Sequence, residues 1–165
     1  AKDGSAIGVL PGVKKLGQER IQAKYTSEKD SMLAFAYYVN KAFEQKLNTI
    51  AIQNEMNLND IKVLAALVNA GHNNTIDDIS DYTGISSLNV SIIITKLNMK
   101  GIVVMEAREG RAHVSLADTA HPIYEQIREA LNDLEDIIFA DISEEDNQKF
   151  NALILKMIQN MRKIV

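Results

Sequence analysis

The chain has 165 residues, 46% of them hydrophobic and 24% charged, and its formal net charge is −4 at pH 7. This balance is typical of one compact domain and excludes a uniformly basic surface, so any contact with nucleic acid must come from a local patch. The absence of cysteine excludes disulfides and thiolate metal sites, and no apolar run is long enough for a signal peptide or a membrane span, so we expect a cytoplasmic protein without a membrane partner.

Residues 1–26 are predicted to form a flexible basic extension. They contain four of the eight glycines, one of the two prolines, and five lysine or arginine residues against two acidic residues. This composition is typical of a segment outside the core. Two interpretations stay open, a solvated tail and a basic arm that touches DNA phosphates.

Two helices are predicted next. Ser27 and Asp30 form a capping-box pattern, and apolar residues recur at helical spacing over about residues 28–56. Asn59 is the predicted N-cap of the second helix, and Gly71 is its predicted end.

A pair of short helices follows. Thr75 and Asp78 form another capping-box pattern, and the helix that they open closes before Gly84. Ser86 opens the next helix, which Gly101 ends. Two short helices joined by a turn that contains glycine indicate a helix-turn-helix.

The pattern then changes from helical to extended. Residues 102–105 and 113–116 are the predicted strands of a hairpin, with Gly110 in the left-handed position of a short loop. A helix-turn-helix followed by a hairpin predicts a winged helix over about residues 58–117.

Two further helices complete the chain. Asp118 is the predicted cap of the first, and Ser143 with Asp146 opens the second. The predicted fold class is therefore mainly α with a small β-hairpin wing, in a single domain over residues 27–165.

The long terminal helices, about 28–56 and 118–162, carry more apolar surface than a monomer usually exposes. We therefore predict that these are dimerisation helices and that the protein is a homodimer. An intramolecular bundle is the alternative.

The order of these elements resembles the MarR (multiple antibiotic resistance regulator) family of winged-helix transcriptional regulators. "LNDIKVL", residues 58–64, resembles the opening of the family's second helix, with Asn59 where a threonine cap is usual. "GISSLNVSIIITKLNMKGIV", residues 84–103, is similar to the family's recognition helix and the start of its wing, and "ISEEDNQKFNALILKMI", residues 142–158, resembles its last helix. The resemblance covers about residues 28–162. It implies a homodimeric repressor that binds an inverted-repeat operator in double-stranded DNA and is released by a small-molecule effector.

The chain also departs from the family's pattern in the recognition helix, in the wing, and at Ala117, where a capping threonine is common. In the recognition helix, Ser91 is followed by Ile92, where family members often carry an arginine. In the wing, Glu109-Gly110-Arg111 stands where the family usually has an aspartate, one residue and an arginine. The resemblance implies that the acid holds the wing and that the arginine enters the minor groove.

A helical wheel of residues 86–100 separates a buried face from an outward face. Val90, Ile94 and Leu97 fall on the buried face, and Ile93 falls at its margin. The outward face is mixed in character and not basic.

The outward face nevertheless predicts DNA contacts. Asn89 is suited to adenine, and Leu88 or Ile92 to thymine methyl groups, while hydroxyl groups can reach phosphates or base edges and basic side chains supply charge. The predicted DNA-binding residues are Ser86, Ser87, Leu88, Asn89, Ser91, Ile92, Thr95, Lys96, Lys100, Arg108 and Arg111. In the alternative interpretation, Leu88, Ile92 and Met99 form an apolar patch for a protein partner, and sequence-specific DNA binding has been lost.

An effector cavity is predicted where the first helix meets the winged unit, a location that the resemblance implies. Phe35, Tyr37, Tyr38 and Met56 are its predicted lining. Ordinary packing is the alternative role for these side chains.

No enzyme chemistry is predicted. His72, His113 and His121 lack the paired spacing of a metal site, although with nearby acids they leave a metal effector as a minor alternative. The pairs Asp77-Asp78 and Glu144-Glu145 lie in first turns of helices, where the helix dipole favours carboxylates. We therefore predict no catalytic residue, no metal ligand and no cofactor.

Overall fold

The computed structural model describes residues 31–70 and 74–164. The predicted extension, the Ser27–Asp30 capping box, Gly71 and His72 lie outside these residues. Internal contacts divide the chain into two units, residues 1–42 and 43–165, and each unit is considered by itself.

The described elements confirm a mainly α fold with a small β-sheet. In chain order they are α2 (Ser31–Gln53), α3 (Leu58–Ala70), β1 (Asn74–Thr75), α4 (Ile76–Thr83), α5 (Ser87–Met99), β2 (Val103–Arg108), β3 (Arg111–Leu116), η2 (Asp118–Ala120), α6 (His121–Ile138) and α7 (Glu144–Met161).

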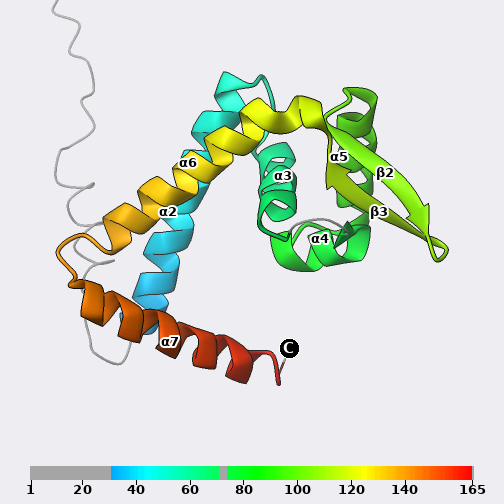
Figure 1. Cartoon of the computed structure of the whole chain (residues 1–165). Helices are drawn as coiled ribbons and strands as arrows, with labels where there is room; N and C mark the ends of the chain where they lie inside the picture. Colours follow the sequence, from blue (N-terminus) through cyan, green and yellow to red (C-terminus); the bar gives the residue numbers. More distant parts are fainter. Residues whose placement is uncertain (1–30, 71–73, 165) are drawn as a thin grey trace, which may run out of the picture. The chain divides into compact units, whose positions relative to one another are not determined.

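The winged helix is built from α3, α4, α5 and the β2–β3 hairpin, which pack against one another in the second unit (Figure 1). The predicted capping box of α4 is present, because the Thr75 side chain accepts from the Asp78 backbone N–H and the Asp78 carboxylate accepts from the Thr75 backbone N–H. Gly84 ends α4 with φ +68°, as predicted. The helix-turn-helix prediction is confirmed.

The prediction that Asn59 caps α3 is wrong. The Asn57 carboxamide accepts from the Asp60 backbone N–H at 3.0 Å, and the Asp60 carboxylate accepts from the Asn57 backbone N–H at 3.2 Å. The capping residue must precede the first helical residue and reach the third, and α3 begins at Leu58. Asn59 therefore lies inside the first turn of α3.

The wing is longer and tighter than predicted. Strands β2 and β3 pair from Val103↔Leu116 to Arg108↔Arg111, so that only Glu109 and Gly110 form the loop. Both loop residues have positive φ, +50° and +77°, which matches the twist of the paired strands and lets the pairing run to the turn. A third strand, β1, pairs with the other edge of β3 and gives the sheet order β1-β3-β2.

The prediction that Asp118 caps a helix is also wrong. Asp118 begins the 3₁₀ turn η2, whose N-cap position is Ala117 and has no side-chain capping hydrogen bond. The helix α6 begins at His121, with Pro122 in its first turn. The Thr119 hydroxyl instead donates to the Gly101 carbonyl, which ties η2 to the end of α5.

One apolar core supports the wing and the helix-turn-helix. Its fully buried side chains include Leu47 of α2, Ile61 and Leu64 of α3, Ile94 and Leu97 of α5, Val114 of β3 and Ile127 of α6. Polar bonds also join the second-unit part of α2 to α6, with Lys46 Nζ 3.0 Å from Asp133 and Asn54 Nδ2 2.7 Å from the Gln126 carboxamide oxygen.

The last helix, α7, contributes no buried side chain. The Ser143 hydroxyl caps it by accepting from the Asp146 backbone N–H at 3.2 Å, and the Phe150 ring meets Phe139 edge to face at 5.5 Å. Beyond this contact, Leu153 and Ile158 expose their side chains.

Candidate nucleic-acid interface

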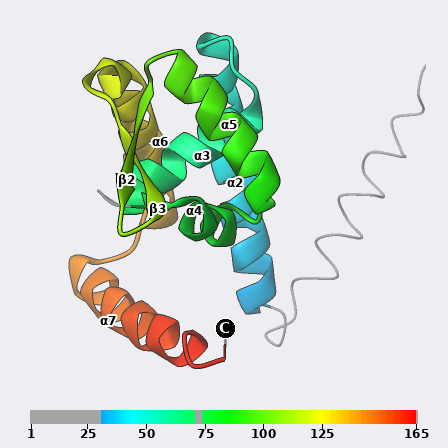
Figure 2. The same cartoon turned by 90° about the vertical axis from the view of Figure 1, so that its right-hand side faces the viewer.

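The outer face of α5 is exposed and carries both apolar and polar side chains. Its buried side carries Val90 and Leu97, in agreement with the helical wheel. On the outer side, Leu88 is 73% exposed, Ile92 59% and Met99 84%. Figure 2 shows α5 and the β2–β3 hairpin from the right-hand side of Figure 1. The core therefore holds the helix while leaving an outward face for a partner.

Lys96 does not project freely from this face. Its ammonium nitrogen lies 2.5 Å and 2.6 Å from the two carboxylate oxygens of Asp60 on α3, and the Asp60 side chain is only 2% exposed. A buried carboxylate needs a charged or hydrogen-bonded partner, and Lys96 together with the Asn57 backbone N–H provides it. Within the fold, the charge of Lys96 is thus paired with Asp60, and its predicted contact with DNA stays a prediction.

Several predicted hydroxyl groups also have local partners. Ser86 caps α5 by accepting from the Asn89 backbone N–H at 3.4 Å, and Ser87 donates to the Asp77 carboxylate at 3.0 Å. Thr95 donates to the Ser91 carbonyl at 2.8 Å. All three hydroxyl oxygens retain lone pairs, but the protons of Ser87 and Thr95 are directed into the protein.

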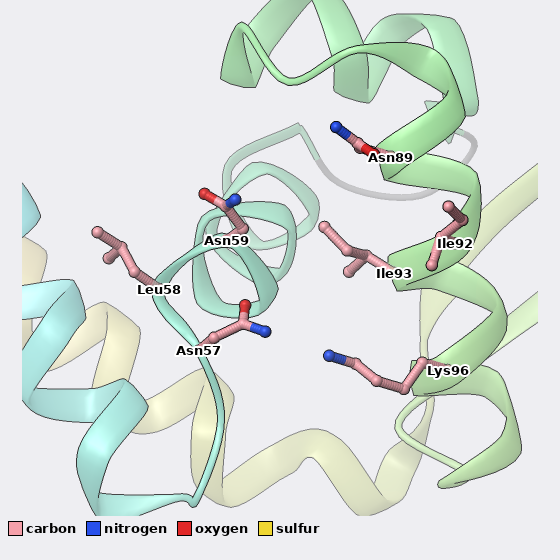
Figure 3. Close-up of a pocket in the computed structure, with 7 residues that line it drawn as sticks. All are labelled: Asn57, Leu58, Asn59, Asn89, Ile92, Ile93 and Lys96. Atoms are coloured by element: carbon pink, nitrogen blue, oxygen red, sulfur yellow. The ribbon is translucent and has the colours of Figure 1, made fainter.

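An open groove of about 500 Å³ lies between the start of α3 and the outer face of α5 (Figure 3). Its lining residues are Asn57, Leu58, Asn59, Asn89, Ile92, Ile93 and Lys96. In Figure 3, the side chains of Asn57 and Lys96 point toward each other across the groove. Apart from Lys96, the polar groups of the groove are neutral carboxamides.

Sequence reasoning missed Asn57 and Asn59 as site residues. The signal for them was their place at the start of α3, the helix that packs against both helices of the helix-turn-helix. As the predicted cap, Asn59 would have used its side chain to bind the helix backbone. In the structure, this side chain lines the groove.

The two wing arginines differ in their surroundings. Arg108 binds the Glu106 carboxylate through Nη2 at 2.5 Å and through Nε at 3.1 Å. Arg111, its cross-strand neighbour, is exposed and forms no salt bridge with the residues that the structure describes. Arg111 is therefore the better placed of the two to meet a phosphate.

The base of the wing is also linked to α4 by charge. The Thr75 hydroxyl and backbone N–H, which donate to the Asp78 carboxylate, lower the pKa of Asp78 below its ordinary value, and the charges of His113 and Arg111 lower it further. His113 pairs with Thr75 across β1 and β3, and Arg111 lies on the same strand, β3.

The predicted effector residues lie in different units. Phe35, Tyr37 and Tyr38 are exposed on the first-unit part of α2, and the two tyrosine rings meet edge to face at 5.4 Å. Met56 packs, partly buried, against the core of the second unit. That the four share a cavity stays a prediction.

A second open cavity, of about 470 Å³, includes none of the predicted effector residues. It is lined by Leu116, Ala117, Asp118, Ala120, His121 and Tyr124. Among residues 31–70 and 74–164, no group of three or more histidine and acidic side chains is arranged to hold a metal ion. None of the helices in these ranges has the length and apolar character that crossing a membrane requires.

Comparison with known proteins identifies the fold. No protein-family model matches the sequence, and no curated protein does. A MarR-family transcriptional regulator from Silicibacter pomeroyi is similar in structure with a TM-score of 0.69 and 17% identity, over 80% of this chain and 90% of that one. A MarR transcriptional regulator from Methanosarcina mazei Go1 has a TM-score of 0.68 and 14% identity, over 87% of this chain and 98% of that one. S. aureus MepR, in a complex with DNA, has a TM-score of 0.59 and 17% identity, over 82% of this chain and 99% of that one. The chain therefore has the winged-helix fold of MarR-family transcriptional regulators.

Proposed function

We propose that this protein is a DNA-binding transcriptional regulator of the MarR type. The observation that carries the proposal is the outer face of α5, which is exposed, contains no acidic residue and rests on a buried apolar face within a winged helix. Similarity to the fold of a protein solved with DNA supports it.

Each protomer would place α5 in the major groove. The start of α3 would lie along the phosphate backbone, and Arg111 at the tip of the wing would reach the adjacent minor groove. A second protomer, related by a two-fold axis, would place its own α5 about one helical turn away. The operator would then be an inverted repeat, and its occupation would repress transcription by blocking polymerase.

The dimer would form through α2, α6 and α7. Support comes from α7, which buries none of its side chains within the chain although apolar residues recur along it. Exposed apolar surface of this kind is unusual in a monomer. A small-molecule effector that changes the distance between the two α5 helices would release the DNA.

Selection of the purified protein against a random duplex pool tests the proposal. We expect enrichment of an inverted repeat with half-sites about one helical turn apart. The double variant Arg108→Ala, Arg111→Ala should bind that site roughly tenfold more weakly or worse, because each protomer loses both cations of its wing. Arg128→Ala removes an exposed cation from α6, outside the winged helix, and serves as the control: once light scattering has verified that it is still a dimer, it should bind normally. Failure to enrich any sequence would contradict the proposal.

The effector requires its own experiment. Thermal unfolding of the protein should shift upward with at least one member of a panel of phenolic acids and divalent metals, because a ligand that binds only the folded state stabilises it. A flat response across the panel would contradict this part of the proposal.

A second candidate function has a specific observation behind it. Leu88, Ile92 and Met99 form an exposed apolar surface that a protein partner would also fit. Under this alternative, the pool selection yields no enriched sequence and DNA binding is weak and sensitive to salt.

A further inference from the structure

We infer that α5 recognises A·T base pairs through thymine methyl groups and does not read guanine. The inference rests on the proposed function and specifies the class of operator half-site. Three features of α5 support the inference. Its one basic residue is already ion-paired, its first two turns expose apolar side chains, and Asn89 carries a carboxamide that can bind adenine.

The cation of α5 is already bound. Lys96 is the only basic residue between Ser87 and Met99, and both carboxylate oxygens of Asp60 hold its ammonium group. Guanine is usually read by arginine or lysine through its O6 and N7 acceptors. Turning Lys96 toward a guanine would leave the Asp60 carboxylate buried without its cation, a loss that outweighs one new base contact.

The first two turns of α5 instead offer apolar side chains. Leu88 and Ile92 lie one turn apart on the outer face, and both are more than half exposed. The amino-terminal part of a recognition helix is the part that contacts base edges. The one apolar group that the base pairs present in the major groove is the thymine methyl, so these side chains match thymine.

Asn89 adds a polar contact of the same preference. It lies on the first turn of α5, between Leu88 and Ile92 in sequence, and lines the open groove. A carboxamide can bind adenine through N6 and N7 at once. Adenine and the thymine methyl belong to the same base pair, so the amide and the two aliphatic side chains favour the same sequence.

Replacement of thymine by uracil in the selected operator tests the inference, because uracil lacks only the methyl group. We expect about fourfold weaker binding for each contacted thymine, the equivalent of about 0.8 kcal/mol for one buried methyl group. In Ile92→Ala or Leu88→Ala, the penalty should vanish at the thymine that the missing side chain contacts. These side chains are exposed, so both variants should fold normally, as circular dichroism can verify.

Met99→Ala is the matched control. Met99 is exposed on the same helix but lies seven residues beyond Ile92, about 10 Å farther along the axis. This variant should keep the full uracil penalty. A penalty that disappears in all three variants would point to a general loss of fit and would overturn the assignment of individual side chains.

The outcomes separate the inference from the proposed function. An enriched operator that tolerates uracil at every thymine, or that depends on guanine contacts within the α5 footprint, would overturn the inference and leave the proposed function intact. Absence of any enriched sequence would overturn both.

Discussion

At the residue scale, the Lys96–Asp60 pair joins α5 to α3 and should respond unequally to the loss of either partner. Asp60 is 2% exposed, whereas 41% of the Lys96 side chain is exposed. Lys96→Met strands a buried carboxylate and should lower the free energy of unfolding by about 3 kcal/mol. Asp60→Asn leaves an ammonium group that can reach water, and should cost only about 1–2 kcal/mol.

Urea unfolding of both variants and of the double variant would measure this asymmetry. The double variant should be more stable than the sum of the two single losses predicts, because it leaves no uncompensated charge. Strict additivity would show that the two groups do not interact.

At the element scale, the α4 cap should make stability depend on pH. The Asp78 carboxylate accepts from the Thr75 hydroxyl and backbone N–H, and its pKa is lowered from 3.8. A depressed pKa in the folded state contributes stability that is present above this unfolded value and that is lost as pH falls through the lower folded value. Asp78→Ala should therefore cost about 1 kcal/mol near neutral pH and progressively less below about pH 4.

Asp81→Asn is the control for this experiment. It removes an acidic group from the same helix, but Asp81 makes no capping contact with Thr75. Its effect on unfolding should be small and should not follow the same pH profile. If Asp78→Ala still lowered the free energy of unfolding by the same amount at pH 2, the electrostatic account would be contradicted.

The wing turn offers a stabilising change. Glu109 adopts φ +50°, a left-handed conformation that disfavours most side chains, and Gly110 follows at +77°. Asn-Gly is the preferred pair for such a two-residue turn, so Glu109→Asn should stabilise the hairpin by about 0.5–1 kcal/mol and raise the thermal midpoint by about 2 °C. Glu109→Ala removes the same charge without the favourable turn chemistry, and it should not raise the midpoint.

The parts of the fold that depend on nearby residues were predictable from the sequence. The Thr75–Asp78 cap and the buried face of α5 follow from side chains within a few positions of each other. The α3 cap was misplaced by two residues, because Asn57 and Asn59 are the same residue type and the sequence pattern does not fix where the first turn begins. The prediction that Asp118 caps a helix failed because residues 118–120 form a 3₁₀ turn. Thr119 in this turn bonds to Gly101, 18 positions earlier, and a local pattern does not reveal such a contact.

The candidate site was less predictable for the same reason. The helical wheel identified which residues of α5 face outward, but it placed Lys96 among them without a partner. Asp60 lies 36 positions earlier, and only the packing of α3 against α5 brings the two charges together. The length of β2 was underestimated because its exposed residues, such as Glu106, show no alternation that marks a strand. The DNA contacts and the effector cavity stay predictions.

At the scale of the whole molecule, the unburied face of α7 should be covered by a second protomer. We expect a mass in solution of twice the 18.3 kDa chain by light scattering. The double variant Leu153→Glu, Ile158→Glu should be monomeric and still helical, because both side chains are exposed within the chain. The variant Gln159→Glu places a charge on the same helix, away from its recurring apolar residues, and should remain dimeric. A monomeric wild-type protein would contradict the assembly.

If the protein binds DNA as proposed, the ion-paired Lys96 also has a consequence for its search along a chromosome. Binding to arbitrary duplex is driven by cations that displace counterions from phosphates, and the central part of α5 contributes none of them. A smaller share of the protein would then be held on unrelated sequence, and each dimer would spend more of its time diffusing freely. Few copies per cell would suffice to keep the operator occupied, and the search would proceed by repeated encounters more than by sliding.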